Sequence, residues 1–165
     1  MSSIEEILCT AAKGGDVGAV LSVLADHPGL NVNWAAPNLN QLTALHFASA
    51  NGHAEVVKLL LAHPHISVNL RNNEGYTPFF LGCFNGHVSV VKLLLKDPRV
   101  DVTVTDLRGC TPLWHASRWG KRHVVEWLIA SGRDLGDISN TKGKDYFGDA
   151  ATRKAAPLRL RKWRG

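Results

Sequence analysis

Thr43-Ala44-Leu45-His46 is the first of three stretches that decide the fold, because related stretches follow it at a constant spacing of 34 residues. The second is Thr77-Pro78-Phe79-Phe80 and the third is Thr111-Pro112-Leu113-Trp114. The agreement continues through Gly52-His53, Gly86-His87 and Gly120-Lys121, and then through Val56-Val57-Lys58-Leu59-Leu60-Leu61, Val90-Val91-Lys92-Leu93-Leu94-Leu95 and Val124-Val125-Glu126-Trp127-Leu128-Ile129. A fixed period of this size indicates a stack of equivalent structural units.

Each copy of the repeat predicts two helices. Gly52, Gly86 and Gly120 suit the left-handed end of a short first helix. The second stretch is apolar at nearly every position, as in residues 56–61, so the helix that it forms must contact neighbours on two sides. Trp127 replaces a leucine of this second helix, and we therefore assign it to the core.

The segment after the second helix predicts an extended connection. Residues 65–76 and 99–110 alternate β-branched and polar side chains, and they then turn at Asn73-Glu74-Gly75 and Leu107-Arg108-Gly109. This pattern is typical of hairpin-like loops.

These motifs resemble the ankyrin-repeat family, whose signature includes Thr-Pro-Leu-His-x-Ala at about this period. The resemblance implies an all-α solenoid in which helix-turn-helix pairs are linked by β-hairpin-like loops. We expect a diverged N-terminal capping repeat at residues 1–37, repeats at 38–71, 72–105 and 106–139, and a degenerate C-terminal partial repeat with a basic tail at 140–165. In such repeats the Thr and His of this signature exchange hydrogen bonds that hold the turn to the first helix. His46 keeps the histidine, whereas Phe80 and Trp114 replace it in the next two copies.

The two end copies depart from the register. Ser3 followed by Glu6 predicts a capping box at the start of the first helix. About three extra residues, mostly within 34–37, separate this copy from the next. In the last copy, cations stand where earlier second helices are apolar, and burying them unpaired would cost roughly 2–7 kcal/mol each. We therefore expect residues 154–165 to be a loose tail.

The composition favours a globular intracellular protein. The chain has 165 residues, of which 45% are hydrophobic and 20% charged, which is enough to bury a full core. Neither a long apolar run nor a signal-peptide pattern is present, so we expect a cytoplasmic or nuclear location. Cys9, Cys83 and Cys110 have no metal-type spacing and fit thiols that stay reduced inside a cell.

The net charge of +5 arises at the C-terminal end. Residues 153–165 contain six of the nineteen basic residues and no acid, which leaves thirteen basic against fourteen acidic residues elsewhere. The alternative function that follows is binding of nucleic acid or an anionic surface by the tail. Its candidate contacts are Arg159, Arg161, Lys162 and Arg164.

Catalysis and metal binding are not expected from the sequence. Among eight histidines, His63 and His65 lie in a loop without a neighbouring acid or cysteine in ligand spacing, and His53 and His87 belong to the repeat. The chain has no Gly-x-Ser-x-Gly elbow and no phosphate-binding glycine loop. We therefore predict no catalytic residues, no metal site, no cofactor and no small-molecule substrate.

The predicted function is binding of another protein on a concave surface. The resemblance implies that this surface is formed by the hairpin tips and the inner face of the first helices. The residues that we predict to contact a partner are Leu39, Asn40, Asn73, Glu74, Tyr76, Phe84, Asn85, Leu107, Arg108, Arg118 and Trp119. The same alignment places Leu42, Ala50, Asn51 and Cys110 at exposed sites.

Four of these residues stand out because aromatic side chains and arginine concentrate binding energy at interfaces. Tyr76, Phe84, Arg118 and Trp119 should lie beside each other in adjacent copies. Phe84 and Trp119 could instead pack on neighbouring helices and seal the stack. The sequence leaves open which protein is bound and whether the chain acts as an inhibitor, adaptor, scaffold or effector.

Overall fold

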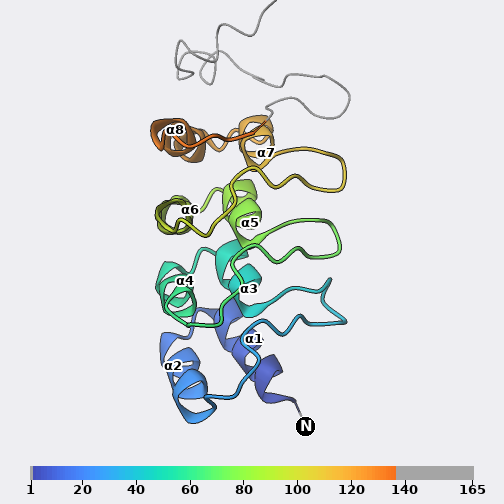
Figure 1. Ribbon diagram of the computed structural model, residues 1–165, viewed down its shortest axis with the longest axis vertical. Coiled ribbons are helices and arrows are strands. Elements are labelled where there is room, and N and C mark those ends of the chain that lie inside the picture. The colour runs from blue at the N-terminus through green and yellow to red at the C-terminus, as the bar shows by residue number, and fades with distance from the viewer. Residues whose placement is uncertain (1, 137–165) are drawn as a thin grey trace, which may run out of the picture.

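The computed structural model describes residues 2–136, which form four helix pairs stacked in chain order (Figure 1). The helices are α1 (Ile4–Gly14), α2 (Val17–Asp26), α3 (Ala44–Ala50), α4 (Ala54–Leu61), α5 (Pro78–Asn85), α6 (Val88–Lys96), α7 (Pro112–Arg118) and α8 (Arg122–Ala130). Within these residues the extended loops contain no strand, only one antiparallel bridge between Ala36 and Leu42. The predicted all-α solenoid is confirmed.

The helices form two layers, and the loops lie on one side of them (Figure 1). The first helices α1, α3, α5 and α7 pack against one another next to the loops, and the second helices α2, α4, α6 and α8 form the other layer. None of the helices between residues 2 and 136 combines the length and the apolar character needed to cross a lipid bilayer. The predicted partial repeat and tail at 140–165 lie outside the described residues.

The starts of the helices follow the sequence signals. Thr43, Thr77 and Thr111 each accept a hydrogen bond at Oγ1 from the backbone N–H three residues later. Ser3 and Glu6 form the predicted capping box, in which each side chain accepts the other residue's backbone N–H at 3.2 Å. These bonds satisfy N–H groups that otherwise lack partners at a helix start.

His46 fixes the second repeat to the third through both of its ring nitrogens. Its Nδ1 accepts hydrogen bonds from the Thr43 hydroxyl at 2.8 Å and the Thr43 N–H at 3.2 Å, and its Nε2 donates to the Tyr76 carbonyl at 3.1 Å. Phe80 and Trp114 stand at the same register position and are buried. In these two copies, buried apolar surface replaces the hydrogen bonds that His46 makes.

A second histidine position, at the start of the second helix, lies against the end of the first helix in the preceding copy. Nε2 of His53 lies 3.0 Å from the carbonyl oxygen of Lys13, and Nε2 of His87 lies 2.9 Å from that of Ala50. Each ring covers the left-handed glycine of the preceding copy. At Gly52, with φ of 79°, a Cβ atom would lie 2.6 Å from Nδ1 of His87.

The assignment of Trp127 to the core is wrong. Its side chain is 44% exposed, and Nζ of Lys92 lies 3.9 Å from the centre of its ring. The equivalent leucines, Leu59 and Leu93, are only partly buried. This position lies at the edge of the second helix that faces solvent, whereas the next one, at Leu128, is fully buried.

Asparagine side chains connect successive loops on the side of the second helices. Asn33 donates to the carbonyl of His65 at 2.7 Å and accepts from the N–H of Ser67 at 2.8 Å. Asn69 makes the same pair of bonds with the carbonyl of Arg99 and the N–H of Asp101. These bonds hold each loop in register with the next.

Candidate functional site

The hairpin tips are built around one side-chain oxygen each. Oδ1 of Asn72 accepts the backbone N–H groups of Glu74 and Tyr76 at 3.0 and 2.9 Å. Oδ1 of Asp106 accepts those of Arg108 and Cys110 at 2.8 and 2.9 Å. Asx side chains stabilise turns in this way, and they give the two loops the same shape.

The tips are also bonded to one another. The N–H of Asn73 donates to the carbonyl of Asn40 at 3.2 Å, and the N–H of Leu107 donates to the carbonyl of Glu74 at 3.3 Å. The three loops therefore form a continuous row. Leu39 and Leu107 are presented on this row with 51% and 73% of their surface exposed.

Six rings from two repeats form what we call the aromatic cluster: Tyr76, Phe80, Phe84, Trp114, His115 and Trp119. Tyr76 stacks on Phe80 with 4.4 Å between ring centres, and His115 lies 4.9 Å from Phe80 and 5.5 Å from Phe84. Phe84 in turn lies 6.2 Å from Trp119. Contacts at these distances stabilise aromatic pairs beyond the area they bury.

The aromatic cluster has a buried floor and an open edge. Phe80, Trp114 and His115 are buried, Tyr76 and Phe84 are half-buried, and Trp119 is 56% exposed. The guanidinium carbon of Arg118 lies 5.7 Å from the ring centres of both Trp114 and Trp119. Flat, partly exposed rings beside a cation can bind a side chain or a backbone segment from another molecule.

The exposed charges around the aromatic cluster are mostly positive. Arg71, Arg108 and Arg118 are exposed, and Glu74 is the exposed acid on the same loops. Asp106 is buried and pairs with Arg108, whose Nε lies 3.5 Å from Oδ2. Counted with the buried Asp106, these side chains are three positive and two negative charges, which is a small positive excess.

Asp106 and His115 form a buried pair beneath this surface, with Nε2 of His115 3.0 Å from Oδ2 of Asp106. Burial raises the pKa of Asp106, but hydrogen bonds from the Cys110 N–H, the His115 ring and the Arg108 N–H outweigh it and hold the pKa below its usual value. Burial lowers the pKa of His115, and the Asp106 charge offsets this only in part. The pair is therefore a neutral imidazole that donates to a carboxylate.

The structure brings together four residues singled out from the sequence. Tyr76, Phe84 and Trp119 belong to the aromatic cluster, and Arg118 lies against its edge. Phe84 and Trp119 also pack on each other, as the alternative of rings that seal the stack expects. Whether either ring contacts a partner stays a prediction.

The other predicted contacts are distributed along the stack. Leu39, Asn73, Glu74, Leu107 and Arg108 are exposed on the hairpin tips. Asn40 is half-buried and adopts a left-handed φ of 59°, and Asn85 donates to the carbonyl of Ala50 at 2.9 Å. Whether any of these residues contacts a partner stays a prediction.

The expected exposure of Cys110 is wrong, because the residue is only 3% exposed. Its backbone N–H is held by Asp106, which turns the residue into the loop. Leu42 and Ala50, which were also expected at the surface, are half-buried.

His115 and Asp106 were missed by sequence reasoning. His115 was counted only as one of eight histidines, and Asp106 only as part of a turn. Their spacing of nine residues across a loop and a helix start is not a known motif. The available signal was that His115 replaces Leu81 and Phe47 of the earlier copies.

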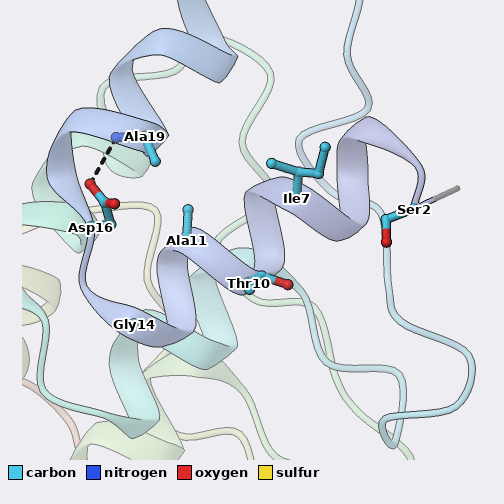
Figure 2. Close-up of a pocket in the computed structure, with 7 residues that line it drawn as sticks. All are labelled: Ser2, Ile7, Thr10, Ala11, Gly14, Asp16 and Ala19. Atoms are coloured by element: carbon cyan, nitrogen blue, oxygen red, sulfur yellow. Dashed lines mark hydrogen bonds between the residues drawn. The ribbon is translucent and has the colours of Figure 1, made fainter.

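The described surface includes hollows at the hairpin tips and at the N-terminal end of the stack. One of about 360 Å³ is lined by Glu74, Tyr76, Asp106, Leu107 and Arg108, beside the aromatic cluster. The other, of about 580 Å³, lies at the N-terminal end of the stack and is lined by residues of α1 and the start of α2, including the partly exposed Ile7 (Figure 2).

The candidate tail contacts Arg159, Arg161, Lys162 and Arg164 lie outside the described residues. The alternative function that depends on them therefore stays a prediction.

Comparison with known proteins gives a consistent assignment. The family described as ankyrin repeats (3 copies) matches residues 4–72 and 65–140. Rabankyrin-5 from mouse and from human is 39% identical over 51 residues, which is 31% of this chain and 4% of the relative. A probable E3 ubiquitin-protein ligase, XBOS32, from rice is 36% identical over 82 residues, which is 50% of this chain and 16% of the relative. The chain thus spans only a small part of these relatives, and its repeat register, its stacked helix pairs and the family match together establish that it belongs to the ankyrin-repeat family.

Proposed function

We propose that the chain binds a partner protein through its hairpin tips and first helices, with the aromatic cluster as the main anchor. Ankyrin repeats are generally non-catalytic modules of protein–protein interaction. The observation that carries the proposal is the open edge of the aromatic cluster, where Trp119 is 56% exposed beside Arg118. Tryptophan and arginine are over-represented among residues that dominate binding energy.

The stack supports this role because it presents the contact residues on a rigid frame. Tyr76 is held by the turn bond to Asn72 and by stacking on Phe80, and Leu107 is held by its bond to Glu74. A surface that is ordered before binding loses less conformational entropy on association.

The positive surface favours a partner with an acidic face. Arg71, Arg108 and Arg118 would steer such a protein toward the loops and would orient it there. The electrostatic contribution to binding should weaken as salt concentration rises, whereas the contribution from burying Trp119 should not.

Trp119→Ala tests the proposal, with Trp127→Ala as a matched control. Both tryptophans are about half exposed, but Trp127 lies on the second-helix layer, away from the loops. Immobilised wild type, Trp119→Ala and Trp127→Ala would be incubated with lysate of the source organism, and captured proteins would be quantified by mass spectrometry.

A partner on the proposed surface should be retained by wild type and Trp127→Ala and lost by about tenfold or more with Trp119→Ala. Thermal unfolding of the two variants should be similar, because each removes a partly exposed ring. Capture of the same proteins in the same amounts by all three chains would reject the aromatic cluster as the anchor.

A further inference from the structure

Three side chains that commonly bind metals converge beneath the last described hairpin. Asp106 comes from the start of the loop, Cys110 from its end, and His115 from α7. All three are buried, and one ligand atom from each lies within 4.8 Å of the others. Carboxylate, thiolate and imidazole are the three ligand types that zinc takes in proteins.

The preceding repeat shows that the loop does not need this set of residues. At the equivalent positions it has Asn72, Tyr76 and Leu81. One amide oxygen of Asn72 accepts the same two backbone N–H groups that Oδ1 of Asp106 accepts. The second oxygen of Asp106, the thiol and the imidazole are therefore not required for the turn.

His115 also differs from the histidine that holds the fold. His46 uses both ring nitrogens in hydrogen bonds within residues 2–136. His115 uses only Nε2, toward Asp106, while its buried Nδ1 has no hydrogen-bond partner there. When a metal ion binds at Nε2, the ring proton moves to Nδ1, so the imidazole stays neutral and loses only its bond to Asp106. The Cys110 thiol binds as the thiolate and releases its proton to solvent.

We propose that Asp106, Cys110 and His115 form a site for a divalent metal ion, and that zinc is the ion it takes. In a tetrahedral zinc site the nitrogen and oxygen ligands are roughly 3.3 Å apart, and nitrogen and sulfur roughly 3.6 Å. Nε2 of His115 and Oδ2 of Asp106 are already 3.0 Å apart. Because the three ligand atoms lie within 4.8 Å of one another, closing the site needs shifts of about an ångström.

The charge and the surroundings suit such an ion. A carboxylate and a thiolate together neutralise a divalent cation, so the loaded site carries no net buried charge. Two backbone N–H groups orient the Asp106 carboxylate from its other oxygen, which is the usual support for a metal ligand.

Asp106 also lines the hollow of about 360 Å³ at the hairpin tip, so one of the three ligand residues borders the solvent-facing surface. The Arg108 side chain, which pairs with Asp106, is 70% exposed and can turn into solvent when the ion binds.

The experiment is a titration of the full chain, reduced and freed of metal, with Co²⁺ and then Zn²⁺. Cobalt bound to a thiolate gives a charge-transfer band in the near ultraviolet, and tetrahedral cobalt gives d–d bands in the visible. We expect both to appear at a single saturable site and to disappear when Zn²⁺ displaces Co²⁺. Zinc should also raise the midpoint of thermal unfolding in a concentration-dependent way.

Asp106→Asn and Cys110→Ser are the decisive variants. The Asn72 turn shows that an amide at position 106 preserves the loop, and Cys110→Ser replaces only the sulfur. Each should lower metal affinity by more than about tenfold, with circular dichroism like that of wild type. Cys9→Ser, which removes a buried thiol far along the stack, should bind as wild type does.

Absence of cobalt bands in wild type, or equal bands in Cys110→Ser, would overturn the proposal. Zinc binding of unchanged affinity in Cys110→Ser would place the ion elsewhere, for example at the surface pair His63 and His65, and would also overturn the proposal. These readouts do not involve a partner protein, so they are independent of the proposed function.

Discussion

Nε2 of His46 lies 3.1 Å from the carbonyl oxygen of Tyr76, so a single imidazole links two consecutive repeats. Because Nδ1 of the same ring accepts bonds from Thr43, the ring must stay neutral to keep all three interactions. Burial lowers the pKa of His46 to about 4. This relationship makes the stack sensitive to acid.

We expect stability to fall as pH decreases from about 6.5 to about 4, because the unfolded chain binds a proton at His46 in this range and the folded chain does not. The loss from this residue should approach about 3 kcal/mol at the lower end. Urea unfolding of wild type and His46→Gln across this range would measure it as the difference between the two pH dependences. Equal dependences, or an NMR titration of the His46 ring near its unperturbed pKa, would contradict the prediction.

Gly52→Ala should destabilise the chain more than Gly120→Ala. Both glycines have positive φ, which costs an L residue about 1–2 kcal/mol. Only at Gly52 would the new Cβ meet the His87 ring, at 2.6 Å, whereas no described atom lies within 4 Å of a Cβ at Gly120. Displacing His87 also sacrifices its bond to Ala50, worth about 1 kcal/mol, and chemical denaturation of the two variants gives the difference. Equal losses would mean that the ring moves aside freely.

Asn69→Ala should cost about 1–2 kcal/mol, because it leaves the carbonyl of Arg99 and the N–H of Asp101 without their bonds to the preceding loop. Ser89→Ala, an exposed change on α6, serves as the control and should lie within about 0.5 kcal/mol of wild type. Hydrogen exchange at the Asp101 amide should accelerate in Asn69→Ala. Unchanged exchange there would indicate that water replaces the asparagine without cost.

Trp127→Leu should be tolerated, with a loss of less than about 1 kcal/mol, since it restores the residue type of the other copies at a partly exposed position. Leu128→Ala, one residue later and fully buried, should cost about 2–5 kcal/mol. The midpoints of thermal and urea unfolding compare the two. A loss of stability well above about 1 kcal/mol for Trp127→Leu would mean that the Trp127 ring contributes to the core after all.

The sequence could predict the parts of the fold that depend on local spacing. The capping box at Ser3, the threonine caps and the left-handed glycines involve residues within a few positions of each other, and the fixed period then defines the stack. The proximity of Tyr76, Phe84 and Trp119 followed from the same period. For these features, the sequence of one copy predicts the structure of the next.

The remaining features depend on contacts between copies and could not be predicted in this way. His115 was missed because its surroundings come from Phe80 and Phe84 of the preceding repeat and from Asp106 across the loop. Cys110 was placed outside because the alignment carries no information on how Asp106 turns the loop. Trp127 was placed inside because it replaces leucines of an apolar helix, and the sequence does not show that Leu59 and Leu93 are themselves only partly buried.

The asparagine links have a mechanical consequence. Asn33 and Asn69 each join a loop only to the loop that follows, and the helices at each junction likewise pack on their nearest neighbours. A force applied along such a linear array passes through the junctions in series, so the total elongation grows with the number of units. The asparagine bonds add to the packing at each junction and so contribute to the stiffness of the array as well as to its register.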